Sequence, residues 1–324
     1  MMDMEKNYFY IILSFFALVF ILLILFLILQ YKPPLLENKL LLSFNTNSLY
    51  IFDTNSNNIV GNIQLDLPYI IRRILRFDGD VYLIAVHQVI LIDSNGKIKK
   101  TIETNDTLVD AFFYNRKLYT LGVIQKGPCN SENISKNFIS YVSVYDPYSL
   151  SLISKKEFKD LFQSFVIFQG RTFVGDFFNS KLYEIKNDNL TQIYLFSDDY
   201  PQRLYSLNDK IIVIGRKQLY IFDPKTNTIY GLSNRSICDF YVDSVIYNNK
   251  LYTICFSRNR TFVFDLNSRK LINEINTSYP FYITLFGNRI YVTSVISKKL
   301  YVIDPTSNSV IKELVFDEGP RVIG

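Results

Sequence analysis

The residues with the clearest chemical potential in this chain form a polar series at matched places in the sequence. Each member lies nine residues before Tyr82, or before the position that corresponds to Tyr82 in a later segment. The series is Arg73, Asp110, Ser164, Arg203, Asp243 and Tyr282. Basic and acidic members follow one another. If the fold gathers them, they form either a ring of ion pairs around a wet channel or a polar binding site for a ligand or peptide.

Motifs for catalysis or metal binding are absent from the sequence. The single histidine, His87, is expected in a surface turn. No Gly-x-Ser-x-Gly elbow, phosphate-binding glycine loop or Cys-x-x-Cys pair occurs. The segment Asp78-Gly79-Asp80 lacks the remaining oxygen ligands of a calcium loop, so we interpret it as a hairpin turn. We therefore expect no metal and no cofactor.

The three cysteines allow at most one disulfide within the chain. Cys129 and Cys238 lie in expected loops, and they are the candidates for a pair. Cys255 lies within an expected strand, so we predict that it is a buried thiol.

The polar series is positioned by a repeat. A strand that ends in a marker residue, a turn rich in Asn, Ser, Thr and Pro, and another strand recur seven times. The markers are Asp53, Asp93, Asp146, Lys186, Asp223, Asp265 and Asp304. Their spacings are 40, 53, 40, 37, 42 and 39 residues, and an insertion near residues 124–138 explains the longest one. We expect each marker aspartate to accept hydrogen bonds from amides of the turn that follows it.

Two further strands precede each marker strand, as at residues 70–77 and 81–86 before Asp93. Each unit is therefore a four-stranded antiparallel meander, and a period near forty residues of such units indicates the blades of a β-propeller. The polar series falls on the innermost strands, which line the central channel.

The two ends of the chain are expected to close the ring. The first repeat has three strands, near residues 39–44, 48–52 and 59–64, whereas the others have four. Residues 320–324 resemble the proline-led start of an innermost strand, so we predict that they complete the first blade. Such a clasp pairs two strand edges that are otherwise exposed. The prediction is an all-β, seven-bladed propeller over residues 39–324.

The last unit reads RIYVTSVISKKLYVIDPTSNSVIKEL over residues 289–314. It resembles the YVTN repeat of seven-bladed propellers, a family known from archaeal surface-layer and exported bacterial proteins. The match is looser in the other units, and Lys186 departs from the marker pattern. The resemblance implies the fold and an extracytoplasmic setting, but it implies no reaction. The tryptophan-containing signatures of quinone-cofactor propellers are excluded because the chain has no tryptophan.

The beginning of the chain is strongly apolar. Residues 8–29 carry no charge, and at about 1.5 Å per residue they span roughly 33 Å, enough for a bilayer core of about 30 Å. We predict a short tail at 1–7, a single transmembrane α-helix at 8–29 and a linker at 30–38. A cleaved signal peptide is the alternative, although no small-residue cleavage site follows.

Charge and glycosylation motifs bear on the surroundings of the propeller. The net charge of +5 is spread along the chain without a basic cluster, so we expect no nucleic-acid partner. Six Asn-x-Ser/Thr motifs follow the apolar segment, which favours an external body that carries glycans. The candidate sites are Asn105, Asn133, Asn189, Asn234, Asn259 and Asn276.

These features predict a membrane-anchored, extracytoplasmic propeller that acts as a binding or scaffold module. Its partner would be a glycan or another membrane or envelope protein, such as a subunit of a membrane complex. The alternative is a lactonase-like hydrolase with a polar site at the channel mouth. A broad, exposed aromatic patch on one face would favour the scaffold, whereas a deep polar cluster or a bound metal would favour the enzyme.

Overall fold

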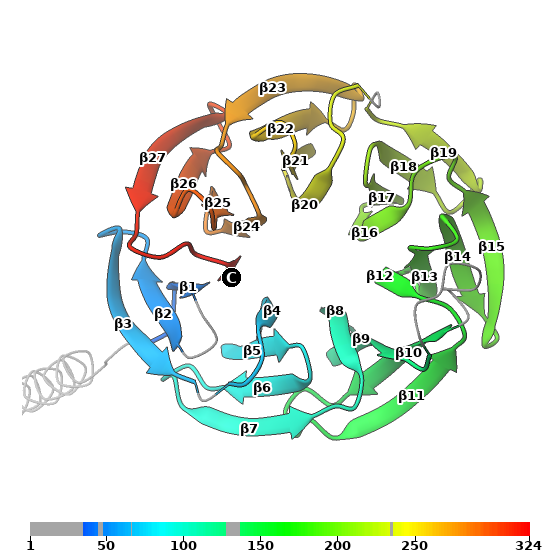
Figure 1. The fold of residues 1–324 in the computed structure, drawn as a ribbon, viewed down its shortest axis with the longest axis horizontal. Helices are drawn as coiled ribbons and strands as arrows, with labels where there is room; N and C mark the ends of the chain where they lie inside the picture. The colour runs from blue at the N-terminus through cyan, green and yellow to red at the C-terminus, as the bar shows by residue number, and fades with distance from the viewer. Residues whose placement is uncertain (1–34, 45–47, 66, 128–136, 234–235) are drawn as a thin grey trace, which may run out of the picture.

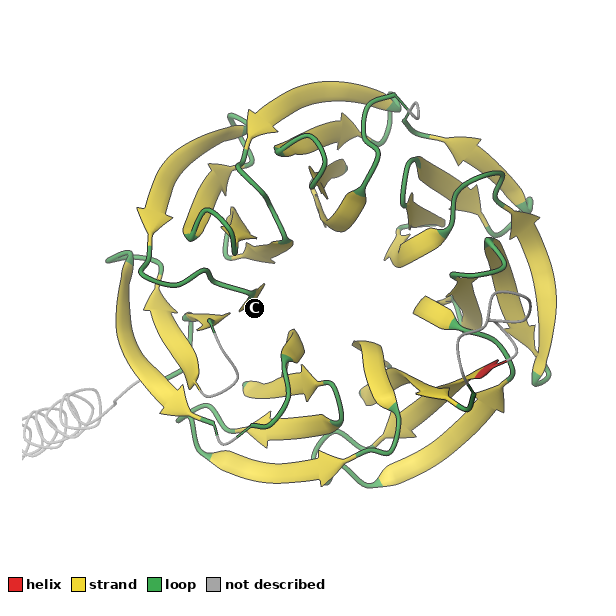
Figure 2. Cartoon of the chain, viewed as in Figure 1, coloured by secondary structure: helices red, strands yellow, loops and turns green. Residues whose placement is uncertain are grey.

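Strand-forming residues dominate the structure. The computed structural model describes residues 35–44, 48–65, 67–127, 137–233 and 236–324. Within these segments, runs of Val, Ile, Tyr and Phe alternate with turns rich in Asn, Asp and Gly, and Figure 2 shows strands joined by short loops. The strands form seven four-stranded antiparallel sheets arranged in a ring around a central axis (Figure 1). The predicted all-β, seven-bladed propeller is confirmed.

Each blade runs from an inner strand at the channel to an outer strand at the rim. Blade 1 contains β28 (Val322–Ile323), β1 (Leu40–Ser43), β2 (Ser48–Asp53) and β3 (Asn58–Gln64). Blade 2 contains β4 (Ile71–Phe77), β5 (Asp80–Ala85), β6 (Gln88–Ile92) and β7 (Ile98–Glu103). Blade 3 contains β8 (Thr107–Tyr114), β9 (Lys117–Gln125), β10 (Phe138–Tyr145) and β11 (Leu152–Phe158).

The remaining blades follow the same order. Blade 4 contains β12 (Phe162–Phe168), β13 (Arg171–Asp176), β14 (Lys181–Lys186) and β15 (Asn189–Leu195). Blade 5 contains β16 (Pro201–Leu207), β17 (Lys210–Gly215), β18 (Leu219–Asp223) and β19 (Thr228–Gly231). Blade 6 contains β20 (Tyr241–Tyr247), β21 (Lys250–Cys255), β22 (Arg260–Asp265) and β23 (Lys270–Asn276). Blade 7 contains β24 (Tyr282–Phe286), β25 (Arg289–Ser294), β26 (Lys299–Asp304) and β27 (Ser309–Val315).

The last strand closes the ring. β28 pairs antiparallel with β1, so that Val322 lies opposite Ser43 and Ile323 opposite Leu42. Gly324 and Leu41 exchange backbone hydrogen bonds of 3.1 and 2.8 Å. The paired strand is shorter than the predicted 320–324, but it occupies the inner place of blade 1, next to β4.

The hydrophobic core lies between neighbouring blades. The two middle strands of a blade are nearly buried, as in β5 and β6, whereas outer strands such as β7 and β11 face solvent. Leu83 and Ile90 of blade 2, for example, share a cluster with Leu41 and Ile51 of blade 1. Apolar burial between sheets therefore holds the blades together.

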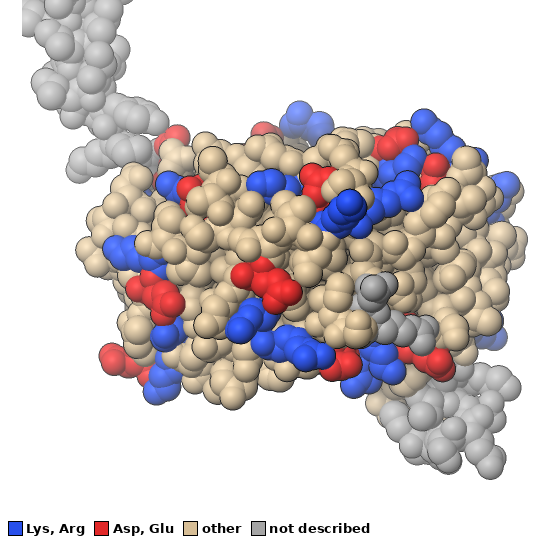
Figure 3. Space-filling model, turned by 90° about the horizontal axis from the view of Figure 1, so that it is seen from above, with Lys and Arg blue, Asp and Glu red and all other residues tan. Residues whose placement is uncertain are grey.

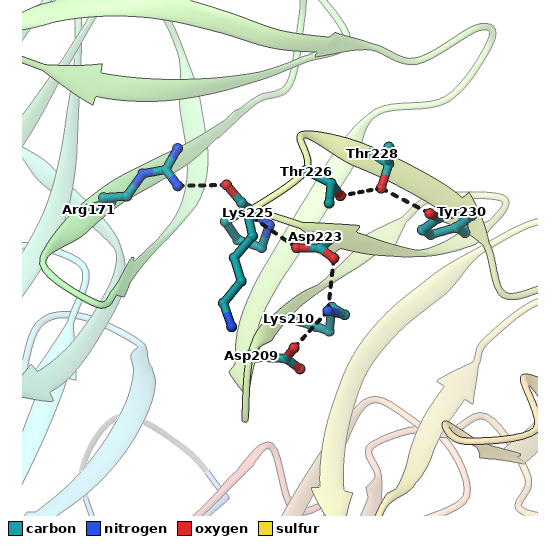
Figure 4. Close-up of polar contacts among 9 residues, drawn as sticks. Arg171, Asp209, Lys210, Asp223, Lys225, Thr226, Thr228 and Tyr230 are labelled. Atoms are coloured by element: carbon teal, nitrogen blue, oxygen red, sulfur yellow. Dashed lines mark hydrogen bonds and ion pairs between the residues drawn. The ribbon is translucent and has the colours of Figure 1, made fainter.

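The marker aspartates stabilise the turns that follow them, as predicted. One carboxylate oxygen, Oδ1, accepts a hydrogen bond from a turn amide in all six cases: Asp53, Asp93, Asp146, Asp223, Asp265 and Asp304. Figure 4 shows Asp223, which accepts from the Lys225 amide and pairs with Lys210 at 2.9 Å. Blade 4 needs no such cap at Lys186, because Asn187 and Asp188 both adopt positive φ in a tight hairpin turn.

A side-chain hydrogen-bond donor links several blades to the next one. The Tyr82 hydroxyl of blade 2 donates to the carbonyl of Pro147 in blade 3 at 2.9 Å. The Tyr252 hydroxyl of blade 6 donates in the same way to Pro305 of blade 7 at 3.1 Å. In blade 4 the donor is Arg171, whose Nη1 lies 2.7 Å from the Pro224 carbonyl (Figure 4).

The propeller has two distinct faces. We call the face at which the inner strand of each blade begins the upper face. The opposite face, which carries the turns between first and second strands and the turns after the markers, is the lower face. Residues 35–38, which fall in the predicted linker, dock on the lower face. Leu36 is buried there, its amide donates to the Ser94 carbonyl, and its own carbonyl accepts from Arg76 at 3.1 Å. The described chain therefore begins at the lower face.

Charges are mixed on the surface. In the side view of Figure 3, basic and acidic residues are interspersed without a large field of one sign. The described residues contain no helix that is both long and apolar enough to cross a membrane. The predicted tail at 1–7 and membrane helix at 8–29 lie outside the described residues.

Candidate functional site

β-Bulges in the inner strands aim the polar series at the channel. The pairing of the inner strand with its neighbour shifts register just before Arg73, Asp110, Ser164 and Arg203, in blades 2 to 5. A bulge kinks the strand and redirects its side chains. Because the shift recurs at the same place, these four residues lie at the same depth in neighbouring blades.

The structure brings the charged members together. Arg73 Nη2 lies 3.0 Å from Asp110 Oδ1 in the neighbouring blade. Arg203 lies 4.0 Å from both Asp110 Oδ1 and Asp243 Oδ1, so it joins carboxylates from two blades. Asp110 and Asp243 are only 5% and 6% exposed. The four residues form one network across the channel, in which the carboxylates are buried and the arginines are half-buried.

Ser164 and Tyr282 complete the series. Ser164 is fully buried, and among the described residues its Oγ has no hydrogen-bond partner. Arg203 Nη1 is also a buried atom without a hydrogen-bond partner among the described residues, and its contact with Asp110 Oδ1 is long, at 4.0 Å. Tyr282 is partly buried and packs against two cores, the one between blades 1 and 2 and the one between blades 7 and 1. Ser164 Oγ and Arg203 Nη1 are thus two buried polar atoms whose hydrogen-bonding capacity the described residues leave unused.

Tyr205 is a channel residue that the sequence reasoning missed. Its hydroxyl donates to Asp243 Oδ1 at 2.7 Å. Tyr205 lies two residues after Arg203 on β16. Because residues two apart on a strand point to the same side, this spacing is the signal that would have identified it.

Electrostatics keeps these groups in fixed protonation states. Burial disfavours the charged form of Arg73, but Asp110 and Asp243 outweigh burial and raise its pKa above the ordinary value. Burial, followed by the charge of Asp243, raises the pKa of Tyr205, so its phenol remains a donor. Arg73 therefore offers a fixed positive charge and Tyr205 a fixed donor.

A cavity of about 380 Å³ adjoins this network. Its wall includes Arg73 and Asp110 at one end, and Tyr114 and Ser206 from the lower ends of inner strands. This volume is within the range of small-ligand sites. The described residues contain no group of three or more His, Cys, Asp or Glu side chains placed to hold a metal ion.

A second hollow lies at the upper face. This groove of about 450 Å³ is formed by blades 1, 2, 6 and 7, and we call it the mouth groove. Most of its wall is apolar, and Ile70, Tyr279, Phe281 and Ile296 are 39–60% exposed. Large apolar side chains left open in one patch indicate a contact surface.

Aromatic side chains continue from this groove around the upper face. We call them the aromatic arc: Phe138, Phe177, Phe178, Tyr200, Phe240, Phe256 and Tyr279. Successive rings are 4.1–6.2 Å apart, except where the Arg216 guanidinium lies between Tyr200 and Phe240, 5.9 and 5.5 Å from the two rings. All come from strand ends and loops of the upper face in blades 3 to 7. Sequence reasoning missed this surface, because aromatic residues occur throughout the chain.

The disulfide differs from the predicted pair. Cys238 is bonded to Cys255, with Cα atoms 6.0 Å apart, so the prediction of a Cys129–Cys238 pair and a Cys255 thiol is wrong. Cys255 is the last residue of β21 and pairs with Tyr241, three residues after Cys238, which brings the two sulfurs together. Cys129 lies outside the described residues. The bond fixes the loop that carries Phe240 of the aromatic arc.

The candidate glycosylation sites differ in exposure. Asn105, Asn189 and Asn276 are exposed, whereas Asn259 is half-buried and its side-chain oxygen accepts from the Tyr279 amide at 3.0 Å. Asn133 and Asn234 lie outside the described residues.

The lone histidine has a structural environment. His87 is half-buried in the turn after β5, its ring packs on Tyr69, and Nδ1 lies 3.1 Å from the Asp106 carbonyl. These contacts are those of a packed turn residue.

Comparisons with known proteins give the fold and no family. No family model matches the chain, and neither does any curated protein. Apo AztD from Citrobacter koseri is 13% identical over 88% of this chain and 96% of its own, with a TM-score of 0.60. A functionally unknown protein from Desulfotomaculum acetoxidans DSM 771 is 14% identical over 88% and 98%, with a TM-score of 0.65. Dihydro-heme d1 dehydrogenase NirN, solved in complex with DHE, is 12% identical over 88% and 65%, with a TM-score of 0.57. At these identities the chain is similar to them in its propeller fold alone.

Proposed function

We propose that this chain is a membrane-tethered, extracytoplasmic propeller that binds a partner protein through its upper face. The observation that carries the proposal is the aromatic arc together with the mouth groove. In this surface Phe178 and Tyr279 are exposed and the other rings of the arc are half-buried. A broad aromatic surface of this kind is typical of protein contacts, because aromatic side chains bury large areas at little entropic cost.

Three features support the setting. Residues 8–29 are long and apolar enough to serve as a membrane anchor. The Cys238–Cys255 bond supports an oxidising compartment, since disulfides persist mainly outside the cytosol. The YVTN-like unit at 289–314 and the exposed sites Asn105, Asn189 and Asn276 favour the same side.

The docking of Leu36 implies how the propeller is presented. Because the described chain begins at the lower face, an anchor before it would hold that face towards the bilayer. The upper face would then point away from the anchor, towards a partner that is membrane-bound or part of the envelope.

The channel network does not favour a hydrolase. Asp110 is engaged by Arg73, and Asp243 accepts from the Tyr205 hydroxyl, whose raised pKa keeps that phenol protonated and weak as a nucleophile. We therefore propose binding and not catalysis as the primary function.

The test is purification of the full chain from native membranes. A variant with Phe178→Ser and Tyr279→Ser should lose the proteins that co-purify with the wild type. Tyr148→Ser, which changes a 51% exposed tyrosine on the lower face, should retain them. Equal recovery with both variants would refute upper-face binding. Digestion of intact cells by added protease should remove the propeller, and its protection would refute the proposed orientation.

A further inference from the structure

The layer of residues just above the channel network contains two arginines. In blade 7 the Phe281 amide donates a hydrogen bond to the Thr293 carbonyl. In blade 1 the Arg321 amide donates to the carbonyl of Ser43, which occupies the position in the second strand that Thr293 occupies in blade 7. Arg72 lies at the bulge between Ile71 and Arg73, at the same level in blade 2. Two arginines and a phenylalanine from three adjoining blades thus share one level.

These arginines line the mouth groove. Arg72 and Arg321 belong to its wall, together with Phe281 and Ile296, and none of the described residues of the wall is a carboxylate. Arg72 lines the groove, whereas Arg73, the next residue, lines the cavity beside Asp110. The bulge at Arg72 explains this difference, because it redirects successive side chains.

The charge of Arg72 is not balanced by the described residues. No ion pair of Arg72 or Arg321 occurs among them, whereas Arg73 pairs with Asp110 at 3.0 Å. Arg72 Nε is buried, and among the same residues it has no hydrogen-bond partner. Burial and the nearby charge of Arg203 lower the pKa of Arg72, which shows that its surroundings disfavour the cation. An anion in the groove would relieve this imbalance.

We propose that the mouth groove binds an acidic peptide segment of the partner protein, with a carboxylate against Arg72 and Arg321 and an apolar side chain against Phe281 and Ile296. This inference rests on the proposed function and names the chemistry that its upper face recognises. Arginine is suited to this role because its planar guanidinium accepts a carboxylate in bidentate fashion.

A peptide fits the surroundings of the groove better than a small molecule. The groove is open, and its wall residues Phe256 and Tyr279 are also members of the aromatic arc. The arc continues to Phe240, whose ring is 6.2 Å from that of Phe256. An extended chain anchored in the groove can therefore run on across the arc, which a compact ligand cannot do.

The experiment is selection of random ten-residue peptides on the immobilised full-length chain in detergent. We expect enrichment of sequences that place Asp or Glu beside Phe, Leu, Ile or Tyr. Replacing the acid of a selected peptide by its amide should weaken binding at least about tenfold, the scale of one charge-assisted contact. Arg72→Met and Arg321→Gln should each weaken binding at least fivefold, and Arg321 is exposed, so its change should not affect folding.

Arg116→Gln is the matched control, since it removes one charge from the lower face, where the Arg116 side chain is 73% exposed. It should leave peptide affinity unchanged. No enrichment, a neutral or basic consensus, or equal binding by the Arg72 and Arg321 variants would overturn the proposal. So would displacement of the peptide by decanoate at equal affinity, which would indicate a site for small amphipathic anions.

Failure of this inference is distinguishable from failure of the proposed function. If no acidic peptide is selected but the wild-type chain still recovers partners that the Phe178 and Tyr279 variant loses, only the groove chemistry is wrong. If that variant recovers the same partners as the wild type, upper-face binding itself is wrong.

Discussion

At the scale of single residues, the channel contains two buried carboxylates, Asp110 and Asp243. Asp110 is 5% exposed and depends on Arg73 at 3.0 Å, with Arg203 more distant at 4.0 Å. A carboxylate in such a site is stable only while its partner remains. The network is therefore a structural element of the inner ring as well as a polar surface.

Arg73→Met should lower the free energy of unfolding by about 2–3 kcal/mol, because it leaves the buried Asp110 with only the distant Arg203 and the Ala111 amide as partners. Urea denaturation of the full chain at pH 7 measures this loss. The double variant Arg73→Met with Asp110→Asn should recover much of it, because no buried charge is then left unpaired. A double variant that is no more stable than the single one would contradict the role of the pair.

Asp160 gives a pH-dependent prediction. Burial and the neighbouring charge of Asp176 raise its pKa to about 6, from 3.8 in the unfolded chain. Between these values the folded protein holds a proton that the unfolded chain has lost, so the free energy of unfolding should fall as pH rises to about 6. Asp160→Asn should remove this fall and add about 1 kcal/mol at pH 7, after allowance for partial exposure.

Urea denaturation from pH 4 to 7.5 tests the change at Asp160. Asp239→Asn, at an exposed position, serves as the control. An unchanged pH profile for the Asp160 variant would contradict the assigned pKa.

At the scale of elements, donors such as Tyr82 connect the blades. Its hydroxyl is fully buried and donates to Pro147 of the next blade. Tyr82→Phe should cost about 1–2 kcal/mol, because it leaves a carbonyl between blades without this donor. Thermal unfolding measures the cost, with the exposed Tyr279→Phe expected to stay within about 0.5 kcal/mol. Equal stability of the two variants would show that the hydroxyl contributes nothing.

The sequence predicted the elements better than the contacts between them. The marker period specified seven blades, because each unit must bury its faces against its neighbours. The offset of nine residues placed Arg73 and Asp110 at one level, because the bulges recur at the same point. The offset of nine residues did not predict the mouth groove. The groove depends on residues such as Arg72 and Phe281, which lie ten residues before the Tyr82 position and one residue before the polar series.

The disulfide was missed for a related reason. The sequence pattern indicates that Cys255 belongs to a strand, but it does not show that Cys255 ends the strand. The pairing of β21 with β20 brings Cys255 next to the loop that contains Cys238. Local pattern identifies an element, whereas partners across elements require the register.

At the scale of the whole molecule, closure should control stability. Deleting residues 319–324 removes β28 and its buried Val322 and Ile323, and it exposes the edge of β1. The loss should be about 3–6 kcal/mol from the two side chains alone. A clear fall in Tm is the expected result, and the exposed Glu318→Ala serves as control. An unchanged Tm would show that the ring does not depend on this clasp.

The central claim is that a partner protein occupies the upper face, and crosslinking from defined positions tests it most directly. A photoreactive residue in place of Ile296, 60% exposed at the mouth groove, is compared in intact cells with one in place of Tyr148, 51% exposed on the lower face. The account predicts a discrete crosslinked protein from position 296 that Arg72→Met reduces, and none from position 148. A crosslink from position 148 alone, or identical adducts from both positions, would contradict it.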